Sequence, residues 1–332
     1  GYPKECANTT LSYSNNSYIG DKALTVSKTA LSLTYPIQYG IIFNWESMEK
    51  IWQHVFSELR ASPQDQPVLL TEVATNPKVN REKMTQIMFE SFNTPGVYIA
   101  TQGVLGLYAA ARLDGVVIDC GHSVCYVVPV SGGYSLPHAV LKTDLAGESL
   151  TNFLSDLLAK RGYTSDRKVI RDIKETLCYV SLDFEQEMRA SSNETTYESN
   201  GQRITIGKEL FSCPEALFTP SLLNLPYDGI HVMTNNSIKN CDQPIRNDLY
   251  ANLVLAGGTS MLPGFAERMK KELMLLAPNI TRINVVAFPD RKFQAWVGGS
   301  ILAAMSTFQQ MYITKEEYQE WGPVIVHRKC YT

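Results

Sequence analysis

The chain has 332 residues, enough for two domains or one large α/β unit. Apolar residues make up 44% of it and charged residues 19%, which can build a sizeable core and excludes a mostly disordered chain. The formal net charge is −3 and no apolar run reaches about 18 residues, so we expect neither a nucleic acid nor a membrane as a direct partner.

The cysteine and histidine content bears on compartment and on metals. Seven cysteines are widely spaced and form no CxxC pair. An odd number at such spacing favours reduced thiols in the cytosol or the nucleus and argues against zinc. With five histidines, a histidine-based metal site is also poorly supported.

Helices and strands are predicted to alternate over the first third of the chain, after a Ser/Asn-rich loop. Asn44 is expected to cap one helix and Asn80 a second, because each precedes apolar residues at helical spacing. Short apolar segments predict a buried strand at 67–71 and another at 97–100, which leads directly into a helix at 101–112. This alternation favours a mostly parallel sheet covered on both faces.

Two later strands are predicted to end in glycine turns. Residues 115–119 form a buried strand, 120–123 a tight turn and 124–130 a returning strand, so the segment is predicted to be a β-hairpin. A second buried strand, at 252–256, runs into the pair Gly257-Gly258. Further helices are predicted at 148–160, at 166–177 and from about Pro263 to Leu276.

Both glycine turns are candidates for phosphate binding. Glycine lets a backbone approach a ligand closely, and successive N–H groups in a turn can cradle an anion. In the hairpin, Asp119 precedes Gly121, and a carboxylate at a strand end can orient Mg²⁺ through waters. An ordinary hairpin turn and an ordinary strand-to-helix turn remain alternatives. No Walker A, HExxH or GxSxG motif occurs, and no GxGxxG follows a strand.

A charged group in the predicted helix at 166–177 has two interpretations. Arg171, Lys174 and Glu175 fall on one face at spacings of three and four residues. By itself this arrangement is most typical of a solvated face.

Long segments of the chain resemble actin, and the chain is identified as a member of that family. The matching segments include Asn44-Trp45, Met48–Trp52, Pro67–Glu72, Asn80–Glu90, Phe92–Pro95, Asp144–Gly147, Arg171–Glu175, Leu182–Met188, Cys213–Phe218, Asp248–Asn252, Trp296–Leu302 and Ile325–Cys330. They span nearly the whole chain and are far more specific than any short motif.

The resemblance implies the α/β actin-like ATPase fold that Hsp70 proteins and sugar kinases share, with two α/β domains of four subdomains around a nucleotide cleft. It implies boundaries at 1–35 for subdomain 2, 36–109 plus 294–332 for subdomain 1, 110–145 plus 226–293 for subdomain 3, and 146–225 for subdomain 4.

The resemblance also implies a site for ATP or ADP with Mg²⁺ or Ca²⁺. Gln102 would position the attacking water, and Asp119 would hold the cation through water. The expected nucleotide-binding residues are Gly121, Ser123 and Val124 at the phosphates, Gly257, Gly258, Thr259 and Met261 along the nucleotide, and Arg171, Lys174, Glu175 and Lys292 around the adenosine. The reaction would be in-line attack of water on the γ-phosphorus.

The chain departs from the family at the phosphate end. Actins open with a strand and a first phosphate loop that have no counterpart here, and we expect roughly 35 further residues before Gly1, because a sheet lacking them would expose an edge. His122 and Ser123 replace the acidic residue and the glycine of the hairpin turn, and Tyr126 replaces a histidine near the catalytic water. We therefore expect nucleotide binding to survive better than hydrolysis.

Two surfaces concern partners. The segment Lys4–Ser17 takes the place of the loop that inserts into the next actin subunit, but lacks the family's Met and Gly pattern. A groove for actin-binding proteins is expected at Tyr108, Tyr134, Ile301, Leu302, Met305, Thr307 and Met311. These seven could instead be core residues of two packed helices.

Three functions follow from the resemblance. The first is an ATP-binding cytoskeletal subunit of the cytoplasm, forming filaments or co-assembling with conventional actin, with weak hydrolysis at most. The second is a non-polymerising structural subunit of a larger assembly, such as a dynein arm, a dynactin-like complex or a nuclear chromatin complex. The third, a sugar kinase, is disfavoured by the long actin-like segments.

Overall fold

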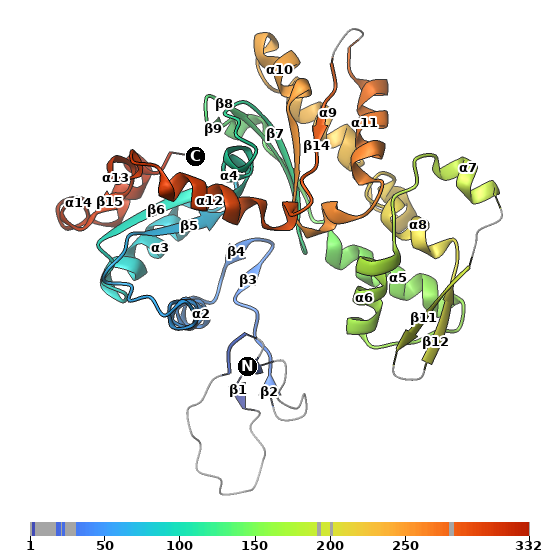
Figure 1. Ribbon diagram of the computed structural model, residues 1–332, viewed down its shortest axis with the longest axis horizontal. Helices are drawn as coiled ribbons and strands as arrows, with labels where there is room; N and C mark the ends of the chain where they lie inside the picture. The colour runs from blue at the N-terminus through green and yellow to red at the C-terminus, as the bar shows by residue number, and fades with distance from the viewer. Residues whose placement is uncertain are drawn as a thin grey trace, which may run out of the picture. The chain divides into compact units, whose positions relative to one another are not determined.

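The computed structural model describes residues 2–3, 18–20, 22–23, 31–190, 194–199, 202–278 and 282–331, and the chain divides into two compact units (Figure 1). The first unit comprises Gly1–Leu70, Thr75–Ile99 and Gln309–Cys330, and the second comprises Thr71–Ala74, Ala100–Phe308 and Tyr331–Thr332. The division into four subdomains is finer and stays a prediction. The segment Lys4–Ser17 lies outside the described residues.

The first unit is organised by a small sheet and two helices. Its strands run in the order β15 (Ile313–Thr314), β6 (Gly96–Thr101), β5 (Val68–Glu72), and its longest helices are α2 (Trp45–Leu59) and α3 (Lys78–Glu90). The predicted cap of α2 is confirmed, because the Asn44 side chain accepts a hydrogen bond from the Ser47 N–H at 2.9 Å.

Two expectations in this unit are wrong. Asn80 does not cap α3, because the helix already begins at Lys78, with Pro77 at the N-cap position. The Asn80 amide donates to the Ile42 carbonyl at 3.3 Å. The strand predicted at 67–71 was expected to be buried, but Val68–Leu70 of β5 are only partly covered, Thr71 is exposed, and only Glu72 is buried.

The remaining elements of the first unit are short. They are β1 (Tyr2–Pro3) with β2 (Leu31–Ser32), β3 (Ile37–Gln38) with β4 (Ile41–Ile42), α13 (Phe308–Met311), α14 (Lys315–Trp321) and α15 (Val326–Lys329).

Cys330 is anchored in this unit by two hydrogen bonds. The Arg81 guanidinium donates to the Cys330 carbonyl at 2.6 Å, and the Ile99 N–H donates to the Cys330 Sγ at 3.3 Å. Cys330 is fully buried.

The second unit is built on a six-stranded sheet. The strand order is β10 (Leu141–Thr143), β8 (Cys125–Ser131), β7 (Gly115–Cys120), β13 (Leu253–Ala256), β14 (Val285–Val286), with β9 (Tyr134–Ser135) paired to β8. The predicted hairpin is confirmed, because β7 and β8 pair antiparallel from Gly115↔Val130 to Cys120↔Cys125. The sheet is mixed, since a tight turn can only return the chain antiparallel, and β13 adds to β7 in parallel.

The helices of the second unit pack against this sheet or against one another. They are α4 (Gln102–Ala109), α5 (Gly147–Lys160), α6 (Arg167–Leu177), α7 (Phe184–Arg189), α8 (Glu209–Glu215), α9 (Ile230–Lys239), α10 (Arg246–Ala251), α11 (Phe265–Leu276) and α12 (Gln294–Ala304), with the hairpin β11 (Thr195–Ser199) and β12 (Gln202–Ile206). Helices α5 and α6 lie side by side (Figure 1). Their apolar side chains share one core with the sheet residues Val116 and Ile118; they are Leu150, Leu154, Ile170 and Ile173.

The link after β13 begins with a 3₁₀ turn, Gly258–Met261, and α11 follows from Phe265, close to the predicted start near Pro263. The 3₁₀ turn lies against β7. None of the described helices combines the length and the apolar character needed to span a bilayer.

Candidate functional site

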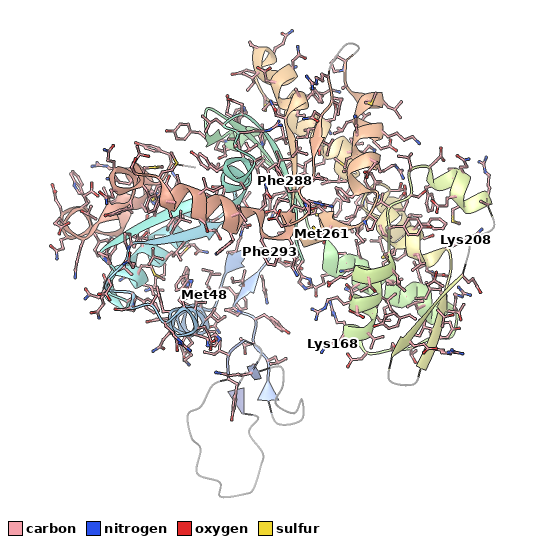
Figure 2. The ribbon with its side chains drawn as sticks, viewed as in Figure 1. Met48, Lys168, Lys208, Met261, Phe288 and Phe293 are labelled. Carbon is pink, nitrogen blue, oxygen red and sulfur yellow. The ribbon has the colours of Figure 1, made fainter. Side chains whose placement is uncertain are left out.

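A cavity of about 550 Å³ lies within the second unit, at the ends of β7 and β13. Its lining residues are Gln102, Asp119, Gly121, His122, Gly147, Lys174, Glu175, Ala256, Gly257, Gly258, Thr259, Met261, Leu262, Arg291, Lys292 and Ala295. Figure 2 labels Met261 in this wall, at the end of the turn that follows β13.

The hairpin turn is fixed from three directions. Its own closing bond runs from the Gly121 N–H to the Val124 carbonyl at 3.0 Å. The Gly121 carbonyl accepts the Gly147 N–H at 3.2 Å and the Thr259 hydroxyl at 2.7 Å. The start of α5 and the turn after β13 are therefore both tied to one carbonyl of the hairpin.

Gly257 makes the closest approach between the two turns. Its φ is +83°, a conformation that favours glycine. A Cβ atom there would collide with the Cys120 carbonyl oxygen and come within 2.5 Å of the Asp119 Oδ1. The Gly257 N–H donates to the Arg291 carbonyl at 3.1 Å, which brings the segment around Arg291 to the same wall of the cavity. Only a residue without a side chain permits this packing.

Lys174 supplies a buried positive charge. Its side chain leaves α6 toward the cavity, and the residue is 5% exposed. The ammonium donates to the Gly147 carbonyl at 2.8 Å and to the Thr151 hydroxyl at 3.0 Å, which are both neutral acceptors. Burial lowers the pKa of Lys174, and the nearby Glu175 carboxylate partly opposes this. A cation held by neutral oxygens at a cavity wall favours an anionic ligand.

Asp119 places a carboxyl group at the end of β7. Burial raises its pKa to about 6, because the charged form loses hydration there. No three His, Cys, Asp or Glu side chains gather as a metal cluster within the described ranges. A cation at Asp119 would therefore depend on ligand oxygens and waters for its remaining ligands.

His122 stands at the rim of the cavity beside an ion pair. Its Nε2 lies 3.9 Å from one oxygen of Glu148, whose other oxygen accepts from Arg167 at 2.6 Å. The Glu148 N–H also donates to the His122 carbonyl at 2.6 Å. The first turn of α5 thus supports the hairpin turn through both backbone and side chain.

Most of the residues expected at the nucleotide line this one cavity. Those that do so are Gln102, Asp119, Gly121, Lys174, Glu175, Gly257, Gly258, Thr259, Met261 and Lys292. Three others do not: Ser123 is partly covered, Val124 is buried, and Arg171 is exposed on α6.

Sequence reasoning missed five lining residues, namely Gly147, Ala256, Leu262, Arg291 and Ala295. Gly147 ends the actin-like segment 144–147 and could have been found from it. Arg291 carries no motif of its own. Its guanidinium is held by the Ser260 carbonyl at 2.7 Å, a contact between residues 31 positions apart.

Of the residues expected in a partner groove, some are exposed and others are covered. Tyr134, Ile301 and Met305 are exposed, whereas Leu302 on α12 is 2% exposed and belongs to the core. Tyr108 on α4 is partly covered, and its hydroxyl would lie 3.3 Å from a Cβ at Gly133, next to Tyr134. Thr307 is exposed after α12, and Met311 belongs to the first unit. The groove stays a prediction.

Two glycine turns and a buried lysine frame the cavity of this α/β fold. Proteins with such a site are suited to bind an anionic ligand. The sequence profile of the family named Actin matches residues 2–331. The chain therefore belongs to the actin family and has its α/β fold. Members of this family generally bind ATP or ADP with a divalent cation, self-associate or bind actin-binding partners, and are typically cytoskeletal.

Proposed function

We propose that this chain is an ATP-binding, actin-like cytoskeletal subunit of the cytoplasm that forms filaments or co-assembles with conventional actin. The observation that carries the proposal is the cavity, which brings ten residues expected from the actin resemblance to one place within the second unit. The glycine cradle at Gly257 and the buried Lys174 ammonium suit a polyanionic ligand.

The proposed roles follow from position. The backbone at Gly121 and at Gly257-Gly258 would approach the phosphates, and Lys174 and Glu175 would face the adenosine, with Met261 and Lys292. A bound Mg²⁺ or Ca²⁺ would offset phosphate charge, and Asp119 would orient its waters.

Hydrolysis is proposed to be weak. Gln102, at the start of α4, lines the cavity and would orient water through its neutral amide. Tyr126 is paired with Asp119 across the hairpin and is 4% exposed. A phenol gives up its proton far less readily than an imidazolium does, so a tyrosine is a poorer proton relay than a histidine. In a phosphate-release assay, Tyr126→His should raise the rate above that of the native chain, and an unchanged rate would remove Tyr126 as the cause.

A non-polymerising structural subunit of a larger assembly is the second proposal, and the His122–Glu148–Arg167 arrangement at the hairpin favours it. In such a subunit, a bound nucleotide would only stabilise the fold. Sedimentation of the native protein after addition of Mg²⁺ and salt separates the two proposals. A pellet that grows with protein concentration supports filament formation, alone or with added conventional actin. Protein that stays in the supernatant under both conditions supports the structural role.

A further inference from the structure

The Lys174 ammonium keeps one N–H group for a ligand. An ammonium group carries three N–H donors. In the part of the chain that the structure describes, Lys174 makes two hydrogen bonds, to the Gly147 carbonyl at 2.8 Å and to the Thr151 hydroxyl at 3.0 Å. The residue is 5% exposed and lines the cavity, so its third N–H is left for a group that enters there.

Thr151 decides where that third N–H points. Its hydroxyl has a single proton, which it donates to the Gly147 carbonyl at 2.9 Å, so toward Lys174 the oxygen acts only as an acceptor. Two acceptors fix both the place of the Lys174 Nζ and the rotation about its Cε–Nζ bond. With the Gly147 carbonyl alone, the side chain could shift and turn its other N–H groups away from the cavity.

The Gly147 carbonyl, which receives both donors, is itself held in place. Gly147 opens α5, and its N–H donates to the Gly121 carbonyl at 3.2 Å. A Cβ atom at Gly147 would lie 2.6 Å from the Thr259 hydroxyl oxygen and 3.4 Å from the Lys174 Nζ. The start of α5 therefore packs too closely for a side chain here, and the acceptor keeps a fixed position beside both glycine turns.

Thr151 acts from behind the wall of the cavity. It is 2% exposed, lies one helical turn after Gly147 in α5 and does not line the cavity. An effect of its hydroxyl on ligand binding must therefore pass through the two lining residues that it contacts, Gly147 and Lys174.

We propose that Thr151 is a positioning residue for ligand binding, which aims the third N–H of Lys174 at the uncharged nucleoside part of the ligand. Nitrogen and oxygen lone pairs of the base and the ribose are acceptors for such a donor. A donor that is held in place before the ligand arrives loses little freedom on binding. The inference rests on the proposed nucleotide pocket and adds to it a residue that governs affinity without touching the ligand.

A double-mutant cycle in the full native chain tests the inference, with ATP and Mg²⁺ titrated by calorimetry. Thr151→Val keeps the shape of the side chain and removes the hydroxyl, so the affinity should fall by about fivefold. In the Lys174→Met background the same change should alter the affinity by less than about twofold, because the group that Thr151 positions is gone.

The outcomes of this cycle separate the inference from the pocket. A loss of about fivefold in both backgrounds, or no loss in the native chain, would overturn the inference and leave the proposed pocket standing. No binding of ATP by the native chain would overturn the pocket as well.

Three further variants separate positioning from a general loss of structure. Thr151→Ser keeps the hydroxyl and should bind ATP within about twofold of the native chain. Thr151→Ala removes the hydroxyl with less bulk beside the ammonium; it should show the same loss as valine, and it replaces valine if that variant does not fold. Thr176, exposed on α6, donates in the same way to the Asp172 carbonyl at 2.7 Å. Thr176→Val should leave the affinity unchanged, and a loss equal to that of Thr151→Val would contradict a local role.

Discussion

The two glycine turns of the cavity look alike in sequence and differ in how much side chain they tolerate. At Gly257, φ is +83° and a Cβ would meet the Cys120 carbonyl and the Asp119 carboxylate. At Gly121, φ is not in the left-handed region, and a Cβ would meet only the Val124 carbonyl oxygen, at 3.3 Å. The turn after β13 is thus constrained by packing against its neighbour, whereas the hairpin turn is held by hydrogen bonds.

Adding one methyl group to each turn tests most directly whether the two turns differ in the side chain they tolerate. Gly257→Ala forces both an unfavourable φ and a clash with backbone, so the free energy of unfolding should fall by about 3 kcal/mol. Gly121→Ala is the matched control and should cost less than about 1 kcal/mol, because its neighbour can yield by a few tenths of an ångström. Urea unfolding of the two variants gives both values. Equal losses would contradict the difference drawn between the turns.

The carboxyl group between the turns predicts a pH dependence. The pKa of Asp119 rises from 3.8 to about 6 on folding, so between these values the folded protein binds more protons than the unfolded chain. Stability without ligand should therefore fall as pH rises from about 4 to about 6. Asp119→Asn removes this loss and should be more stable than the native chain at pH 7 by about 2 kcal/mol.

Urea unfolding at several pH values checks the Asp119 prediction, with Asp156→Asn, at an exposed position on α5, as the control. A native chain whose stability rises over the same pH window would contradict it.

Lys174 lets the cavity wall be altered without changing either turn. Lys174→Met keeps most of the side-chain volume and removes a charge that burial disfavours, so the ligand-free protein should lose little stability. Its affinity for ATP should fall by about tenfold, because the ligand loses a fixed cation. Lys168→Met, at an exposed position on the same helix (Figure 2), should leave affinity unchanged. A similar drop in both variants would mean that the effect is not local to the cavity.

The smallest expected effect concerns the bond that joins the turns. Thr259→Val removes the hydroxyl that donates to the Gly121 carbonyl. The free energy of unfolding should fall by only about 1 kcal/mol, since that carbonyl still accepts the Gly147 N–H. Thr259→Ser retains the donor and should recover most of this in the same urea assay. If Thr259→Ser loses clearly more stability than Thr259→Val, the methyl group rather than the hydroxyl bond holds this turn in place.

Local elements were predictable from sequence, whereas long-range partners were not. The hairpin at 115–130 and the Asn44 cap follow from alternation and spacing, and both are confirmed. The second predicted cap is wrong because α3 begins at Lys78, after Pro77, and the Asn80 amide donates to Ile42, 38 positions away. The same limit applies to α6, where Arg171 and Glu175 are exposed but Lys174 is buried by the first turn of α5, which no local pattern encodes.

Hydrogen exchange of the full native chain, with and without ATP, tests the central claim most directly. The account predicts that ATP slows exchange at two separate segments, 119–124 and 256–262, while α2 of the first unit stays unchanged. Calorimetry on the same sample shows whether ATP binds. ATP binding without slower exchange at either turn would contradict the claim, because the ligand would then occupy another part of the molecule.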